Sequence, residues 1–165
     1  MAIADMLLPE FDHEMATTRK LLERVPEGQF GWKPHGKSFS LGQLAQHVAT
    51  LPSWGQITLQ QTEFDVAANP QHPPVATRAA LLELFDRNSA ATRQALVDKT
   101  DAELMAPWAL KSGAVTVFSM PKVTVWRSFV MNHLVHHRGQ LSVYLRLRDV
   151  PLPAMYGPSA DEQAF

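Results

Sequence analysis

The sequence predicts an all-α fold, a four-helix bundle with a crossover connection and a short hairpin or loop before the last helix. Prolines divide the chain into four long segments, and each segment places apolar residues three and four positions apart, which is the period of an α-helix. Helices of about 20 residues are about 30 Å long and suit a compact bundle. The long connection before the last segment is consistent with a crossover. The chain has 165 residues, which is close to the length of one typical domain. Residues 1–165 are therefore expected to form a single domain.

The first two segments carry clear start and stop signals. Residues 4–25 form the first predicted helix, and Pro26 ends it because proline cannot continue a helix. The second helix is expected to begin at Ser40, since Ser40 and Gln43 have the spacing of a capping box. Pro52 lacks the N–H that would bond to the preceding turn, so a kink is expected there.

The third segment begins after a proline-rich stretch. Residues 77–99 have the helical period, and Thr77 is a suitable N-cap. Thr100 and Glu103 repeat the capping-box spacing and predict one short additional turn. Residues 108–118 are rich in β-branched and aromatic side chains, which favours a short hairpin or an ordered loop.

The fourth predicted helix covers residues 123–148 and ends before Pro151. Its residues at spacings of three and four are expected to face the bundle centre. They are Trp126, Val130, His133, His137, Gln140, Tyr144 and Leu147. Two imidazoles and an amide would therefore interrupt an apolar face, and burying them without partners would cost a few kcal/mol. A metal ion is one partner that would satisfy them.

His133 and His137 are four residues apart, so their side chains project from adjacent turns of one helix face. Zinc needs at least one more ligand, and His47 shares the inner edge of the second predicted helix. Three histidines from two facing helices would leave a coordination position open for water or substrate, as catalytic zinc sites do. The alternative is a core network in which the three histidines bind each other by hydrogen bonds without metal.

The other polar candidates are weaker. His136 is one position off the predicted inner face and is expected on a flank, while Arg138 is expected either in solvent or beside an anionic substrate. Three further histidines are expected to have surface or local hydrogen-bonding roles: His13, His35 and His72. The tryptophans are interpreted as packing residues: Trp32, Trp54, Trp108 and Trp126.

Composition excludes several classes of protein. The chain has no cysteine, which excludes disulfide scaffolds, cysteine-ligated metal sites and a cysteine nucleophile. Its net charge of −1 offers no basic field for nucleic acid. Its apolar runs are much shorter than the ~20 residues of a membrane helix, and no export signal is visible. A cytoplasmic protein without nucleic-acid or membrane partners is expected.

Three stretches resemble the DinB-like family of four-helix metal-binding proteins. They are Trp32-Lys33-Pro34, the run from Ser40 to His47, and the run from Asn132 to Gln140. The family pattern has one histidine in the second helix and an H-x-x-x-H pair in the fourth, which match His47, His133 and His137. The resemblance implies a divalent ion, commonly zinc or nickel, with water completing its shell. It also implies a homodimer.

The resemblance implies an activity only in outline. Related branches are transferases that use low-molecular-weight thiols such as mycothiol or bacillithiol, so a metal-dependent thiol S-transferase acting on a small molecule is expected. Because the chain has no cysteine, such a thiol would have to arrive on a cosubstrate. A metal-dependent hydrolase and a non-enzymatic metal-binding module are the alternatives. Four carboxylates are candidates for a general base, and the sequence does not distinguish among them: Asp12, Glu14, Glu83 and Asp86.

Overall fold

The computed structural model describes residues 2–68 and 73–163. The helices are α1 (Ile3–Leu22), α2 (Leu41–Gln60), α3 (Arg78–Leu96), α4 (Asp101–Met105), α5 (Lys122–Val125) and α6 (Asn132–Arg146). The strands are β1 (Glu63–Asp65), β2 (Pro107–Ser112) and β3 (Val115–Pro121). Short 3₁₀ turns lie at Glu27–Gln29 and Val66–Ala68, and a π-helical segment, Trp126–Met131, joins α5 to α6.

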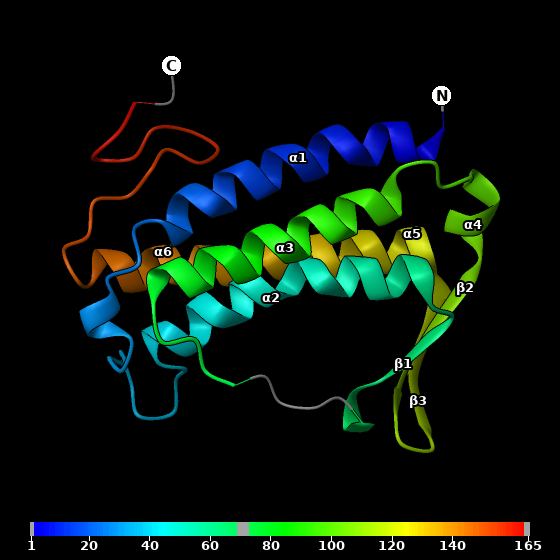
Figure 1. Ribbon diagram of the computed structural model, residues 1–165, viewed down its shortest axis with the longest axis horizontal. Helices are drawn as coiled ribbons and strands as arrows, with labels where there is room; N and C mark the ends of the chain where they lie inside the picture. Colours follow the sequence, from blue (N-terminus) through cyan, green and yellow to red (C-terminus); the bar gives the residue numbers. More distant parts are fainter. Residues whose placement is uncertain (1, 69–72, 164–165) are drawn as a thin grey trace.

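Four long helical segments lie lengthwise beside one another, as Figure 1 shows for α1, α2, α3 and the continuous helix from α5 to α6. Helix α2 packs against both α3 and α6, and α1 packs against α3. Their facing sides form the main apolar core, in which Phe11, Leu44 and Leu81 are almost completely buried. This packing places one face of α2 directly against the helix that carries the H-x-x-x-H pair.

The predicted helix starts are confirmed by their capping contacts. The Ser40 hydroxyl accepts a hydrogen bond from the Gln43 backbone N–H, and the Gln43 side chain accepts one from the Ser40 N–H. Thr77 caps α3 through the N–H of Ala80. Helix α2 continues through Pro52, whose carbonyl accepts a hydrogen bond from the Thr92 hydroxyl at 2.6 Å. A contact from α3 thus supports α2 at its proline.

The prediction of an all-α fold is wrong, because the chain also forms a three-stranded sheet in the order β1-β2-β3. The expected hairpin is present as the antiparallel pair β2 and β3. Strand β1 then pairs in parallel with β2, with Phe64 opposite Leu110. A three-residue strand is too short to show a two-residue period, so β1 has no local signal in the sequence. The sheet lies at one end of the bundle (Figure 1).

The π-helical segment changes which side of α6 is buried. Trp126 and Val130 are buried as predicted, but within α6 the buried residues are Leu134, Arg138, Leu141 and Leu145. Each lies one position after the residue predicted to face inward. A π turn contains an additional residue, so a face extrapolated at the α-helical period is displaced downstream of it. Leu147, predicted to face inward, is therefore 56% exposed.

Within the described ranges, no helix combines the length and the apolar character that crossing a membrane would require.

Candidate metal centre

Three imidazole rings from two helices meet at one point of the bundle. His47 comes from α2, and His133 and His137 come from consecutive turns of α6. One nitrogen of each ring lies within 4.8 Å of the others, and the Nε2 atoms of His47 and His133 are 3.4 Å apart. The ring of His47 also meets that of His137 edge-on, with 4.5 Å between their centroids. All three rings are half-buried, at the edge of the core rather than inside it.

Neighbouring groups orient two of the rings. The Nδ1 atom of His137 lies 2.8 Å from the side-chain Oε1 of Gln140. Because an amide oxygen only accepts hydrogen bonds, Nδ1 carries the proton and Nε2 of His137 keeps its lone pair. The ring of His133 packs against Phe129, with 5.7 Å between the centroids. Phe129 belongs to the π-helical segment, so that segment contributes directly to the surroundings of His133.

The surroundings keep the rings uncharged. Burial is the main cause that lowers the pKa of His47 to about 4, and the nearby rings of His137 and His133 contribute to this shift in the same direction. Burial is also the main cause that lowers the pKa values of His133 and His137. At neutral pH each ring is therefore an imidazole with a free lone pair, which is the form that binds metal ions.

The separation of the Nε2 atoms of His47 and His133 fits a shared metal ion better than a hydrogen bond. Two nitrogen ligands about 2.0–2.1 Å from a tetrahedral zinc ion lie roughly 3.4 Å apart, whereas a hydrogen bond from N–H is usually about 2.7–3.2 Å long. The 3.4 Å between His47 and His133 matches the first value. Three neutral nitrogen donors also suit zinc or nickel by their chemistry.

The remaining histidines lie away from this centre or outside the described residues. His136 is exposed and only flanks the ring of His137. His13 is exposed, and His35 accepts a hydrogen bond from the backbone of Lys37, which is the local role expected of it. His72 and the neighbouring Pro70 lie outside the residues that the structure describes.

The carboxylates considered as general bases are mostly held by arginines. Asp12 pairs with Arg93, and Asp86 pairs with Arg19, in both cases across α1 and α3. Glu14 pairs with Arg138. The structure therefore assigns these three carboxylates to ion pairs between helices rather than to the histidine centre.

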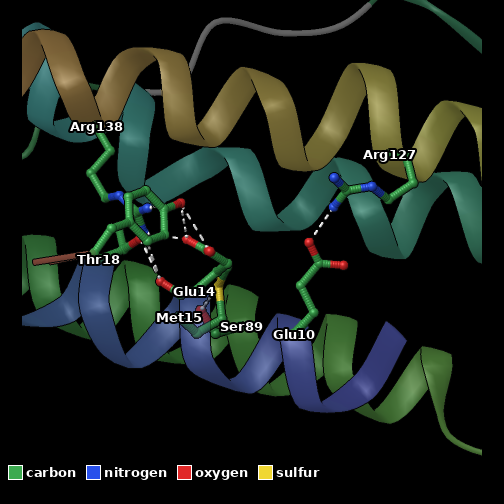
Figure 2. A network of polar contacts seen from close by, with 8 residues as sticks. Glu10, Glu14, Met15, Thr18, Ser89, Arg127 and Arg138 are labelled. Carbon is green, nitrogen blue, oxygen red and sulfur yellow. Dashed lines mark hydrogen bonds and ion pairs between the residues drawn. The ribbon is translucent and has the colours of Figure 1, made fainter. Parts of the chain in front are cut away.

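The expectation that Arg138 lies in solvent or beside a substrate is wrong. The residue is 1% exposed, and its guanidinium contacts Glu14, the Thr18 hydroxyl and the Tyr156 hydroxyl (Figure 2). A sequence signal for this burial did exist, since Leu134, Leu141 and Leu145 form an apolar stripe with Arg138 at helical spacing.

A groove of about 530 Å³ lies along α2 and includes His47 in its wall. The other lining residues are Phe30, Phe39, Ser40, Gly42, Gln43, Gln46, Thr50, Ser53, Trp54, Ile57, Pro74 and Val75. His47 is the member of the histidine centre that belongs to this lining, so the groove reaches the centre at His47.

Comparison with known sequences decides the family. A sequence profile described as "DinB family" matches residues 2–164. The chain belongs to the DinB family. This DinB chain is 27% identical over 161 residues to the uncharacterised protein YrdA of Bacillus subtilis strain 168, which covers 97% of this chain and 92% of YrdA.

Solved structures of DinB-like proteins share the fold. A DinB-like protein of Bacillus subtilis (YjoA) has a TM-score of 0.71 at 19% identity, covering 97% of this chain and 99% of that one. A DinB-like protein of Bacillus cereus ATCC 10987 has a TM-score of 0.69 at 20% identity, covering 90% and 95%. At these identities the likeness establishes the DinB fold alone.

Proposed function

We propose that this DinB-family chain holds a divalent ion, zinc or nickel, through His47, His133 and His137, and that the ion serves a thiol-transfer reaction on a small molecule. The observation that supports this most is the 3.4 Å between the Nε2 atoms of His47 and His133, which is the spacing of two ligands on one tetrahedral ion. The lowered pKa values of all three rings add to it, because they keep the lone pairs available.

The chain's own residues supply binding, orientation and access. The three imidazoles are neutral ligands, and Gln140 holds the ring of His137 in one orientation. The groove along α2 gives a small molecule a route to His47. A bound divalent ion would act as a Lewis acid and lower the pKa of a water or thiol that reaches it. An ion held by three uncharged ligands keeps its full positive charge for this purpose.

The absence of cysteine means that the reacting thiol must arrive on a cosubstrate. In the proposed reaction the thiol sulfur forms a new bond to a carbon of the second substrate. The leaving group departs with the electron pair of the broken bond, and the thiol proton passes to solvent. A low-molecular-weight thiol is the proposed cosubstrate, and a homodimer stays a prediction.

The experiment compares metal binding and activity in matched variants of protein purified without an affinity tag. We expect about one zinc or nickel ion per chain, with binding lost in His47→Ala and His133→Ala. His136→Ala is the control, because His136 is exposed beside the centre but is not one of the converging rings. Equal loss in the control, or no metal in the wild type, would contradict the proposal and favour a hydrogen-bonded histidine network.

Activity assays on the metal-loaded protein then separate the reaction types. We expect transfer of a thiol to an electrophilic acceptor and no hydrolysis of esters or amides. Hydrolysis without thiol transfer would replace the transferase proposal by a hydrolase. If removing the metal unfolds the chain outright, the ion is structural, because its binding energy is then folding energy.

A further inference from the structure

The wall of the groove carries no formal charge. Among its lining residues within the described parts of the chain there is no lysine, arginine, aspartate or glutamate. His47 is the only lining residue with an imidazole or other readily titrating group. A charged group placed against this wall would lose hydration without gaining an ion pair, which is unfavourable. The part of a ligand that lies against the wall is therefore uncharged.

The stretch of the groove from His47 to Trp54 has a defined length. His47 and Trp54 are seven residues apart on α2, two turns along the same face and about 10 Å along the helix axis. The ring of Trp54 is held edge-on by Phe64 at 5.1 Å and by Phe129 at 5.3 Å between centroids. A fixed aromatic surface of this kind suits an apolar end group.

Between His47 and Trp54 the groove offers hydrogen-bond acceptors. Thr50 and Ser53 line it, and each hydroxyl donates its proton within α2. The Thr50 hydroxyl donates to the carbonyl of Gln46 at 2.9 Å, and the Ser53 hydroxyl donates to the carbonyl of Thr50 at 2.8 Å. Because a hydroxyl has one proton, each of these oxygens can make a further hydrogen bond only as an acceptor.

The third polar side chain in this part of the groove is that of Gln46, which makes hydrogen bonds through both its amide nitrogen and its amide oxygen. The Gln46 side-chain amide donates to the carbonyl of Pro73 and accepts from the N–H of Val75, each at 2.9 Å. It therefore holds the segment 73–75 as part of the groove wall. Thr50 and Ser53 supply the two hydroxyl acceptors of this stretch, and the Gln46 amide keeps one N–H and one oxygen lone pair beyond its two contacts.

From these contacts we infer that the substrate arm between His47 and Trp54 is uncharged, carries a hydrogen-bond donor such as a secondary amide N–H, and ends in an aryl or alkyl group. The inference rests on the proposed function in taking the three histidines as the place of reaction. It names the substrate class as N-aryl or N-alkyl amides and similar uncharged donors.

The test uses small probes and the full metal-free chain, so that it does not depend on the ion. N-benzylacetamide has the donor, N-benzyl-N-methylacetamide lacks it, and phenylacetate and benzylammonium carry charges of opposite sign. Binding is measured by NMR, from the chemical-shift changes of the backbone amides of Thr50 and Ser53 and of the Trp54 indole. We expect N-benzylacetamide to bind about fivefold more tightly than its N-methyl analogue, which is the effect of about one hydrogen bond, and about tenfold more tightly than either charged probe.

Two matched variants assign the preference to the groove. Thr50→Val keeps the shape of the side chain and removes its oxygen, and Ser53→Ala removes the second acceptor. In each, the ratio between the two amides should fall toward one. Thr116→Val, at an exposed threonine of β3, should leave the ratio unchanged.

The outcomes of this test and of the metal experiment are separable. Equal binding of the two amides to the wild type, tighter binding of a charged probe, or shifts confined to residues away from the groove would overturn the inference. A chain that shows the amide preference but binds no zinc would contradict only the proposed function. A chain that binds zinc but shows no preference would contradict only the inference.

Discussion

Arg138 of α6 and Glu14 of α1 form an ion pair with 2.6 Å between Nη1 and Oε2, and only 2% and 9% of their side chains are exposed. The hydroxyl of Tyr156 completes the arrangement by donating to the Glu14 carboxylate at 2.9 Å and lying 2.5 Å from Arg138 Nη2. The pair thus connects α1, α6 and the C-terminal segment, and Figure 2 shows Arg138 reaching from α6 toward Glu14.

Removing one partner of this buried pair is expected to destabilise the protein strongly. Glu14→Ala leaves a buried guanidinium without its counter-charge, which costs about 3–5 kcal/mol. The double variant Glu14→Leu with Arg138→Met should recover much of that loss, because neither charge is then buried. Urea denaturation of the single and double variants gives the two free energies of unfolding.

The exposed pair of Asp12 and Arg93 is the control for that experiment, with 2.8 Å between its atoms and side chains 44% and 50% exposed. Asp12→Ala should cost at most about 1 kcal/mol, because solvent screens an exposed pair. Similar losses in Asp12→Ala and Glu14→Ala would show that burial of the Arg138 pair does not determine its contribution.

Two glycines in helices should respond to alanine with opposite signs. In Gly55→Ala the new Cβ would lie 2.6 Å from Thr92 Cγ2 and 3.0 Å from Trp126 Cζ3. Such overpacking typically costs about 1–3 kcal/mol, which outweighs the roughly 0.5–1 kcal/mol that alanine adds in a helix. The free energy of unfolding should therefore decrease.

Gly139 of α6 is the matched case, because a Cβ there has no atom within 4 Å. Gly139→Ala should raise the free energy of unfolding by up to about 1 kcal/mol through helix propensity alone. Thermal unfolding of both variants measures the difference. A stabilised Gly55→Ala variant would show that α2 and α3 can separate at this position without cost.

Gln140 is expected to influence metal affinity without binding the metal. Its Oε1 lies 2.8 Å from Nδ1 of His137, so Gln140→Ala frees the ring to rotate. Loss of such a supporting contact typically weakens metal binding about 10–100-fold. Competition between the protein and a chelating zinc indicator measures the change.

Gln140→Glu keeps an oxygen acceptor at this position and should retain most of the zinc affinity. Asn132→Ala is the control, because Asn132 is an exposed residue of the same helix. Unchanged zinc affinity in Gln140→Ala would mean that packing alone orients the ring of His137.

The metal-free protein should lose stability as the pH falls below neutrality. His47 has a folded-state pKa of about 4, against about 6.5 in the unfolded chain. Between these values the unfolded chain binds a proton that the folded chain does not, so unfolding becomes more favourable as the pH falls. The contribution of His47 is fully present above about pH 6.5 and is lost progressively toward pH 4.

Urea denaturation of metal-free wild type and His47→Gln across this range measures the effect. The variant should show a weaker dependence of stability on pH, because glutamine does not titrate. A ring of His47 that protonates near its ordinary pKa in an NMR titration of the metal-free protein would contradict the expected burial.

Local sequence signals accounted for much of the helical framework. Helix starts at Ser40, Thr77 and Thr100 were predictable because a cap involves residues only three apart. That His133 and His137 lie on one face was predictable for the same reason, and their convergence with His47 agrees with the spacing of the apolar residues on α2. Their role as metal ligands stays a prediction.

The sequence by itself therefore determined features that depend on neighbours within one or two helical turns, namely the helix starts and the pairing of His133 with His137. Tertiary structure decided the parallel pairing of β1 with β2, because β1 and β2 are far apart in the sequence. It also decided the burial of Arg138, because a guanidinium is stable inside the bundle only where Glu14 on another helix supplies its counter-charge.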